Sequence, residues 1–199
     1  LSAGQGIGIN TLFGAAHERR NGMAVIHIST AELKEKISEI HAGDEVFLSG
    51  TVYTARDAAH KRIRALLEAG KPLPFPLEGA VIYYAGPTPE RPGSPIGSCG
   101  PTTSSRMDVY TPQLLANGLC AMIGKGPRSP EVVQAIVKNK AGYFCAIGGA
   151  GALAAMAVKK MEVIAFEELG CESVKRLEIQ EFPVLCAIDS YGVNLFDRK

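Results

Sequence analysis

Residues 97–107, GSCGPTTSSRM, place four consecutive hydroxyl side chains directly before an arginine. Thr102 opens the hydroxyl run, and Arg106 follows it with a guanidinium that matches a carboxylate in two parallel hydrogen bonds. A threonine hydroxyl is a poor base at its ordinary pKa, and it works as one only where a cation or metal stabilises its oxyanion. The pattern indicates a site that grips an anion and moves a proton, although a turn that caps the following helix explains the same residues equally well.

A second charged group lies at Arg56 and Asp57, where a predicted strand over residues 45–55 gives way to a predicted helix over residues 56–70. The N-terminus of a helix attracts anions through its unpaired N–H groups and its dipole. An arginine beside it adds a fork that fits a carboxylate. Taken alone, these two residues favour a simpler interpretation, in which Asp57 caps the helix and Arg56 makes a surface ion pair.

A third group is Lys125, which follows an apolar run and lies between Gly124 and Gly126. Glycine neighbours let the backbone approach a ligand closely, while the ammonium supplies a point charge. A solvated lysine in a tight turn is the ordinary alternative. Considered together, the three groups place cations at the ends of predicted strands in a chain whose net charge is only +1, and three cations suit a substrate with two carboxylates.

The elements that must position these groups alternate between strand and helix. Short apolar runs rich in strand-forming residues each lead into a segment with helical spacing, which predicts an α/β fold with a layered sheet and flanking helices. In such sheets, ligand-binding loops gather at the carboxyl ends of the strands. Strands are predicted within residues 45–55, 80–88, 119–126, 143–149, 161–166, 174–182 and 183–190, and helices within residues 29–42, 56–70, 107–118, 129–142 and 150–160.

The composition limits the class of protein. With 199 residues, of which 46% are hydrophobic and 21% charged, the chain is expected to form one domain with a buried core. The net charge argues against a nucleic-acid-binding surface, and no apolar run approaches the roughly 20 residues that span a bilayer. Residues 1–22 are rich in glycine and predict a poorly ordered leader, linker or cloning remnant, with the domain over residues 23–199.

The five cysteines are odd in number and never spaced as C-x-x-C. This spacing argues against a disulfide framework and favours a reducing, cytoplasmic location. It also argues against a zinc or iron–sulfur site built from neighbouring cysteines, so no metal ligands are predicted in this chain.

Five segments resemble, in order and spacing, the β subunit or C-terminal domain of iron–sulfur-dependent class I fumarases and L-tartrate dehydratases. They are TARDAAHKR, YYAGPT, GPTTSSRM, GKG and EFPVLCAIDSYGVN, and the resemblance runs from about Ile28 to the C-terminus. It implies a swivelling β/β/α domain that closes over a larger domain holding a [4Fe–4S] cluster. The implied reaction is the reversible addition of water across the double bond of a dicarboxylate, fumarate to S-malate in the type case.

The resemblance also implies a role for each motif residue. Thr102 corresponds to the catalytic base, Arg56 and Arg106 to carboxylate-binding arginines, and Lys125 to a substrate-contacting lysine. The cluster belongs to a partner α subunit, whose iron acts as a Lewis acid on the leaving hydroxyl. Supporting rather than chemical roles are expected for Asp57, His60, Thr103 and Ser104.

Several alternatives remain open at this point. Tartrate, or the mesaconate/citramalate pair, is the second choice of substrate, because the shared carboxylates cannot distinguish these compounds. A non-catalytic anion-binding assembly subunit is a hypothesis from a different class. A self-sufficient hydrolase that uses Thr102 or a nearby serine as nucleophile ranks last, since no histidine lies in a nucleophile motif. A chain isolated from its partner is also expected to be capable of self-association.

Two further features have no assigned role. The glycine-rich residues 146–155 are interpreted as allowing close packing of a helix on the sheet, with an approach to substrate as the alternative. Asp189 and Asn194 near the C-terminus are explained equally well by a turn at a strand end and by ligand binding.

Overall fold

The computed structural model describes residues 17–20, 23–89, 95–146 and 150–197. Its described strands form one sheet in the order β1-β2-β3-β4-β5-β6-β8-β7. The strands are β1 (His17–Arg20), β2 (Met23–Ser29), β3 (Glu45–Thr54), β4 (Val81–Tyr83), β5 (Ala121–Gly124), β6 (Gly142–Ala146), β7 (Val158–Ala165) and β8 (Val174–Ile188). The α-helices are α1 (Leu33–Lys36), α2 (Asp57–Glu68), α3 (Thr111–Ala116), α4 (Pro130–Asn139) and α5 (Ala150–Ala157), and the 3₁₀ helices are η1 (Ile37–Glu39), η2 (Ser104–Met107), η3 (Glu167–Glu172) and η4 (Leu195–Asp197).

The sheet closes on itself through β3 and β8, which pair antiparallel along most of their length. The end of β3 pairs in parallel with β4, and β4, β5 and β6 continue as parallel neighbours. The second half of β8 pairs with β6, which completes a barrel-like circuit of five strands. Closure of this kind leaves fewer exposed strand edges than an open sheet.

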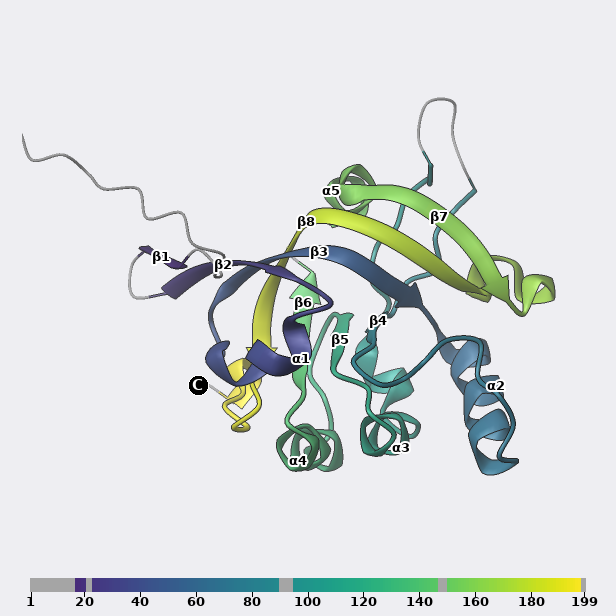
Figure 1. Ribbon diagram of the computed structural model, residues 1–199, viewed down its shortest axis with the longest axis horizontal. Coiled ribbons are helices and arrows are strands. Elements are labelled where there is room, and N and C mark those ends of the chain that lie inside the picture. Colours follow the sequence, from purple (N-terminus) through teal and green to yellow (C-terminus); the bar gives the residue numbers. More distant parts are fainter. Residues whose placement is uncertain (1–16, 21–22, 90–94, 147–149, 198–199) are drawn as a thin grey trace, which may run out of the picture.

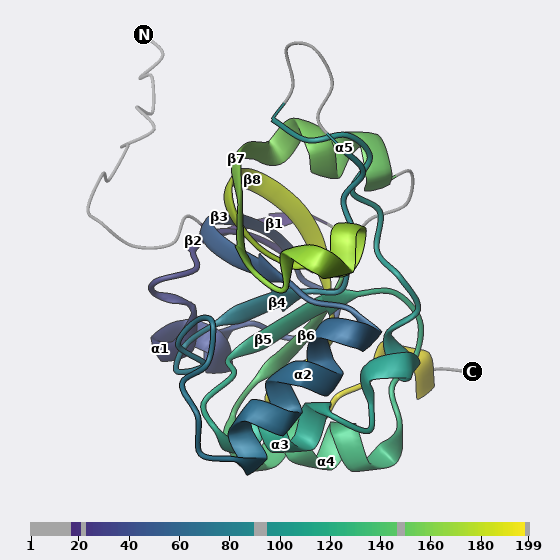
Figure 2. The same cartoon turned by 90° about the vertical axis from the view of Figure 1, so that its right-hand side faces the viewer.

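Two layers of strands and one layer of helices are visible in Figure 1, where β3, β8 and β7 arch over β4, β5 and β6, and α2, α3 and α4 lie beneath. The side view in Figure 2 shows the same stack from its end. The alternation of side chains along β4 explains these layers. Val81 and Tyr83 join the apolar cluster between the two strand layers. Ile82 and the following Tyr84 join the cluster between the strands and the helices. Strands buried on both faces carry continuous apolar runs, so the predicted layered α/β fold is confirmed.

Several element boundaries differ from the prediction. The predicted strands over residues 174–182 and 183–190 form one 15-residue strand, β8. The positive φ of 51° at Glu181, next to Phe182, and a register shift against β3 accommodate the break at Pro183 within a continuous strand. Strand β2 was missed because its alternating residues, MAVIHIS, directly follow the glycine-rich segment.

The N-terminal segment is only partly described. Residues His17–Arg20 form β1 and pair antiparallel with β2. The rest of the predicted leader, residues 1–16 and 21–22, lies outside the described residues, as does the glycine turn at residues 147–149. In the described parts of the chain, no helix combines the length and apolar character needed to cross a bilayer.

Candidate functional site

The three predicted cationic groups lie at one end of the sheet, beyond the carboxyl ends of β3, β4 and β5. Arg56 lies between β3 and α2, and Lys125 directly follows β5. The backbone N–H of Thr102 donates to the carbonyl of Tyr84 just after β4, at 2.7 Å. Because β3, β4 and β5 run parallel, their ends bring these groups to the same place.

The hydroxyl run and the lysine are joined by backbone contacts. Thr103 forms a β-bridge with Lys125, and the N–H of Ser104 donates to the Lys125 carbonyl at 3.0 Å. In return the Lys125 N–H donates to Ser104 Oγ at 2.9 Å. A Cβ on Gly124 would lie 1.9 Å from that oxygen, so the approach requires glycine at this position. Ser104 thus fixes the spacing between the two loops, in keeping with the supporting role expected for it.

Arg106 joins the hydroxyl run to the start of α2. Its Nε donates to Asp57 Oδ1 at 2.8 Å. Asp57 adjoins Arg56, so the two arginines flank one helix terminus instead of lying on opposite faces of the molecule. The expectation that Asp57 caps α2 is wrong, because no side chain of the N-cap position bonds to the helix and Asp57 itself is the first helical residue. Its carboxylate orients Arg106 instead.

The groups that project from this end of the sheet have no hydrogen-bond partners in the part of the chain that the structure describes. Among the described residues, nothing hydrogen-bonds the hydroxyls of Thr102 and Thr103, the Lys125 ammonium or the two Nη atoms of Arg106. Thr102 is half-buried, while Lys125 and Arg106 are exposed. The site therefore presents two hydroxyls and two positively charged donors that are free to bind an anion.

Arg56 is held more tightly. Its Nη2 lies 3.2 Å from Glu172 Oε1, and a Cβ on Gly86 would come within 3.1 Å of its Nη1. The second oxygen of Glu172 accepts the N–H of Ala58 at 3.1 Å, so Glu172, and not Asp57, caps a backbone N–H of the first turn of α2. Sequence reasoning missed this residue, since Glu172 lies in an ordinary acidic segment far along the chain.

His60 contacts the backbone at the same end of α2. It is fully buried on α2 between the rings of Tyr84 and Tyr110, and its Nδ1 lies 2.9 Å from the carbonyl of Arg56. Burial lowers the pKa of His60 from 6.5 to about 4, so the ring is neutral and its Nδ1–H donates to that carbonyl. This geometry suits positioning of the Arg56 backbone and offers no direct contact with a ligand.

The depressed pKa of His60 predicts how stability depends on pH. Between pH 6.5 and 4 the unfolded chain binds a proton on this ring and the folded chain does not. We therefore expect this contribution to be fully present above pH 6.5 and to fall by about 2 kcal/mol between pH 7 and 5. Urea unfolding of the wild type and of His60→Gln at both pH values measures it. An equally steep dependence in His60→Gln would contradict the assignment.

A second residue that sequence reasoning missed is Arg128, whose side chain has no exposed surface. Its Nε donates to Asp108 Oδ1 at 2.7 Å and its Nη2 to Thr111 Oγ1 at 2.8 Å. Asp108 follows η2, and its other oxygen accepts the N–H of Ser129 at 2.8 Å. The buried pair thereby ties the hydroxyl-bearing loop to the loop that carries Lys125. The only signal in the sequence was an arginine within the GKGPRSP turn.

The cysteines do not fit a metal cluster in the part of the chain that the structure describes. No three His, Cys, Asp or Glu side chains gather there with metal-ligand geometry. Burial raises the pKa of the Cys99 and Cys120 thiols to about 12, which disfavours the thiolate that a metal requires. The described side chains therefore supply no ligand set for an iron–sulfur cluster.

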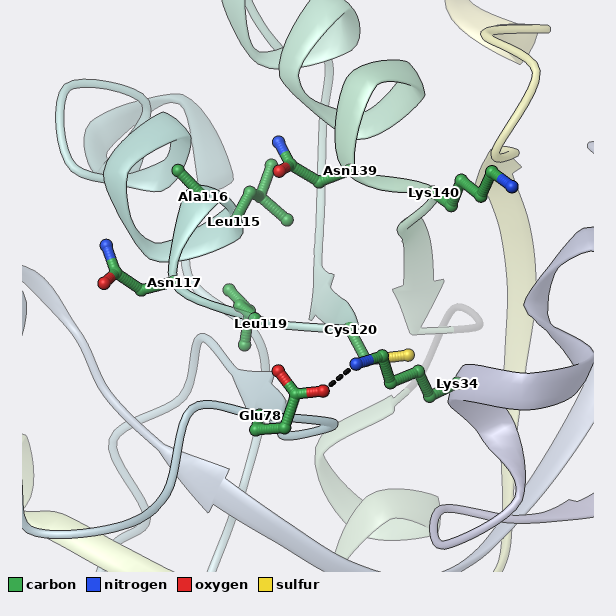
Figure 3. Close-up of a pocket in the computed structure, with 10 residues that line it drawn as sticks. Lys34, Glu78, Leu115, Ala116, Asn117, Leu119, Cys120, Asn139 and Lys140 are labelled. Carbon is green, nitrogen blue, oxygen red and sulfur yellow. Dashed lines mark ion pairs between the residues drawn. The ribbon is translucent and has the colours of Figure 1, made fainter.

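A cavity of about 230 Å³ lies at the opposite end of the sheet, near the amino ends of β5 and β6. Figure 3 shows Lys34 pointing across its mouth to form an ion pair with Glu78. Asn117 and Asn139 bond back to carbonyls of their own helices. This cavity contains none of the predicted site residues.

The two polar residues near the C-terminus build a turn. Asp189 Oδ1 accepts the N–H groups of Tyr191 and Val193, each at 3.0 Å, and Oδ2 accepts that of Ala42 at 3.0 Å. Asn194 Oδ1 accepts the N–H of Phe196 at 3.1 Å. These contacts favour the structural interpretation of both residues over ligand binding.

Several known proteins are similar to this chain in sequence. Residues 8–199 match the model of the family described as Fumarase C-terminus, so the match begins well before Ile28. Fumarate hydratase 1, mitochondrial, of Leishmania major is 40% identical over 169 residues, which cover 84% of this chain and 31% of that protein. The L(+)-tartrate dehydratase subunit beta of Escherichia coli K12 is 35% identical over 174 residues, which cover 84% of this chain and 85% of that subunit.

A putative L(+)-tartrate dehydratase subunit beta of Methanocaldococcus jannaschii is 36% identical over 171 residues, which cover 88% of that subunit. The chain thus spans about a third of the length of the fumarate hydratases it matches and most of the length of the tartrate dehydratase β subunits. The extent of these matches shows that the chain belongs to the Fumarase C-terminus family.

Proposed function

We propose that this chain is the β subunit of a [4Fe–4S]-dependent hydro-lyase that hydrates a four-carbon dicarboxylate reversibly, with fumarate and S-malate as the substrate pair. The observation that carries the proposal is the meeting of Arg56, Arg106 and Lys125 beside the free hydroxyl of Thr102. The names of the relatives, fumarate hydratase and tartrate dehydratase, support the reaction class. In this proposal the chain acts as a swivelling domain that closes over its partner.

The charges at the site favour an anionic ligand. Arg106 and Lys125 present unengaged donors, and Arg56 adds a third positive charge behind them. Asp57 and Glu172 offset two of these three charges, which leaves one in surplus. A dicarboxylate carries two negative charges, so this surplus supports a site that a partner completes.

The proposed chemistry follows from the position of Thr102. In the dehydration direction its Oγ takes a proton from the carbon next to a substrate carboxylate, and negative charge then builds on that carboxylate. Positive side chains aimed at the carboxylate stabilise this transition state more than the ground state. Lys125 and Arg106 flank the hydroxyl run and also favour the deprotonated form of the threonine that accepts the proton.

The cluster itself is assigned to a partner α subunit, because the described cysteines of this chain do not fit its ligand set. When bound there, its iron would supply a Lewis acid for the substrate hydroxyl. The residues of this chain bind and orient the dicarboxylate and move the proton.

Tartrate is the second candidate substrate. The chain matches most of the length of the two tartrate dehydratase β subunits, whereas it matches only about a third of the fumarate hydratases. Both compounds present two carboxylates to Arg106 and Lys125, so the second hydroxyl of tartrate must be recognised by other groups.

Anaerobic reconstitution tests the proposal. The chain alone should be inactive as a hydratase, and activity should appear when it is mixed with a cluster-loaded α subunit. Fumarate, tartrate and mesaconate are assayed side by side, and the substrate with the highest kcat/KM is the assigned one. Hydration of fumarate at a normal rate by the metal-free chain alone would refute the two-subunit proposal. Lack of activity on all three by a correctly assembled complex would favour a non-catalytic anion-binding subunit.

A further inference from the structure

Glu172 brings a carboxylate from η3 to the start of α2. Its Oε1 lies 3.2 Å from Arg56 Nη2, and its Oε2 accepts the N–H of Ala58 at 3.1 Å. The side chains of Arg56 and Glu172 are each only 22% exposed. One carboxylate thus occupies the anion-attracting end of α2 and engages the arginine beside it.

A buried lysine holds the turn that carries Glu172. Lys175 Nζ donates to Ser173 Oγ at 2.7 Å and to the carbonyls of Gly170 and Cys171 at 3.0 and 3.2 Å. Lys175 is only 5% exposed, and its backbone N–H donates to Thr54 Oγ1 at 3.1 Å near the end of β3. Moving Glu172 away from Arg56 by shifting this turn would strip a buried ammonium of its acceptors, which is costly. The backbone of Glu172 is therefore fixed beside Arg56, and the N–H of Ala58 holds the carboxylate itself.

The guanidinium of Arg56 is confined on its remaining sides as well. A Cβ on Gly86 would approach both Arg56 Nη1 and the carbonyl of Cys171 to 3.1 Å. Arg56 Nε is buried and has no hydrogen-bond partner among the described residues. The guanidinium is thus wedged between the backbone after β4 and the turn that carries Glu172.

We propose that Glu172 is a positioning residue that fixes the orientation of Arg56 before a dicarboxylate binds. The proposal rests on the proposed function, in which Arg56 helps to bind the substrate. An arginine side chain that is ordered only on binding loses conformational entropy at that step, which lowers affinity. If an ion pair already orders the side chain in the folded chain, substrate binding does not carry this entropy loss. Glu172 acts through Arg56 and touches no reacting atom.

Glu172→Gln tests this role, because glutamine keeps the size and an acceptor for the Ala58 N–H but removes the charge. Glu168→Gln is the matched control, since Glu168 lies in the same turn and pairs with Arg62 of the same helix. In the reconstituted enzyme we expect Glu172→Gln to raise KM by about tenfold with kcat within about threefold of wild type. Glu168→Gln should change neither KM nor kcat. Glu172→Asp keeps the charge, so its KM should lie between that of the wild type and that of Glu172→Gln.

A second measurement does not depend on activity. In the 199-residue chain alone, ¹⁵N relaxation of the Arg56 Nε–Hε group should report a rigid side chain in the wild type and in Glu168→Gln, and a mobile one in Glu172→Gln. An unchanged Arg56 signal in a folded Glu172→Gln chain overturns the proposal. An unchanged or lower KM in Glu172→Gln also overturns the proposal. A lower KM would mean that the Glu172 carboxylate competes with the substrate for Arg56 in the wild type. If the complex acts on no dicarboxylate, the proposed function fails while the relaxation data still decide the role of Glu172.

Discussion

Thr102→Ala should lower kcat of the reconstituted enzyme by about 10²–10⁴-fold, the usual contribution of a positioned general base. The Thr102 backbone N–H is bonded to the carbonyl of Tyr84, and its hydroxyl has no partner among the described residues. Removal of the hydroxyl therefore breaks no hydrogen bond to a described residue, and the fold should be unchanged. Because the loss falls on the proton transfer and not on the binding groups, KM should change much less than kcat. Steady-state kinetics at saturating dicarboxylate measure both quantities.

Ser105→Ala is the matched control, because Ser105 is exposed, lies in the same hydroxyl run and uses only its backbone in the hydrogen bonds of the turn. It should keep wild-type kcat. Thr102→Ser keeps a hydroxyl and should recover most of the activity that the alanine variant loses. If Thr102→Ala and Ser105→Ala have the same kcat, the base lies elsewhere and the hydroxyl run serves only as a turn.

The place of the site was predictable because it depends on local patterns. Arg56 and Lys125 each directly follow a predicted strand, and strands that lead into helices run parallel, with their carboxyl ends at the same end of the sheet. The hydroxyl run is brought there by the hydrogen bond from the Thr102 N–H to the carbonyl of Tyr84, just after β4. The contacts Arg106–Asp57 and Ser104–Lys125 join the three segments in the structure. Parallel strand order and a count of charges were sufficient to place the cations together.

The residues that hold those cations were not predictable in the same way. Glu172 reaches Arg56 only because β8 pairs antiparallel with β3 and places the turn before β8 over the start of α2. This pairing joins segments more than a hundred residues apart, and no local period of the sequence encodes it. Arg128 was missed for a different reason, since a single arginine in a Gly-Pro turn normally lies in solvent.

The burial of Arg128 carries the largest expected effect on stability. Its guanidinium carbon lies 5.3 Å from the ring centre of Tyr84 and 4.9 Å from that of Tyr143, so two aromatic rings pack against the guanidinium that pairs with Asp108. Arg128→Met fills much of the volume but leaves the Asp108 carboxylate without its counter-charge. Breaking one side of a buried pair costs about 3–5 kcal/mol, and we expect the free energy of unfolding to fall by that amount.

Urea unfolding followed by circular dichroism measures the difference, and Arg64→Ala is its control. Arg64 also pairs with a carboxylate, Glu68 at 2.7 Å, but on the exposed face of α2, where its removal should leave the free energy of unfolding nearly unchanged. The Asp108→Asn/Arg128→Met double variant leaves no unpaired charge and should regain part of the lost stability. A loss for Arg128→Met as small as that for Arg64→Ala would mean that the two loops of the site are held together by their backbone contacts, with the buried pair contributing little.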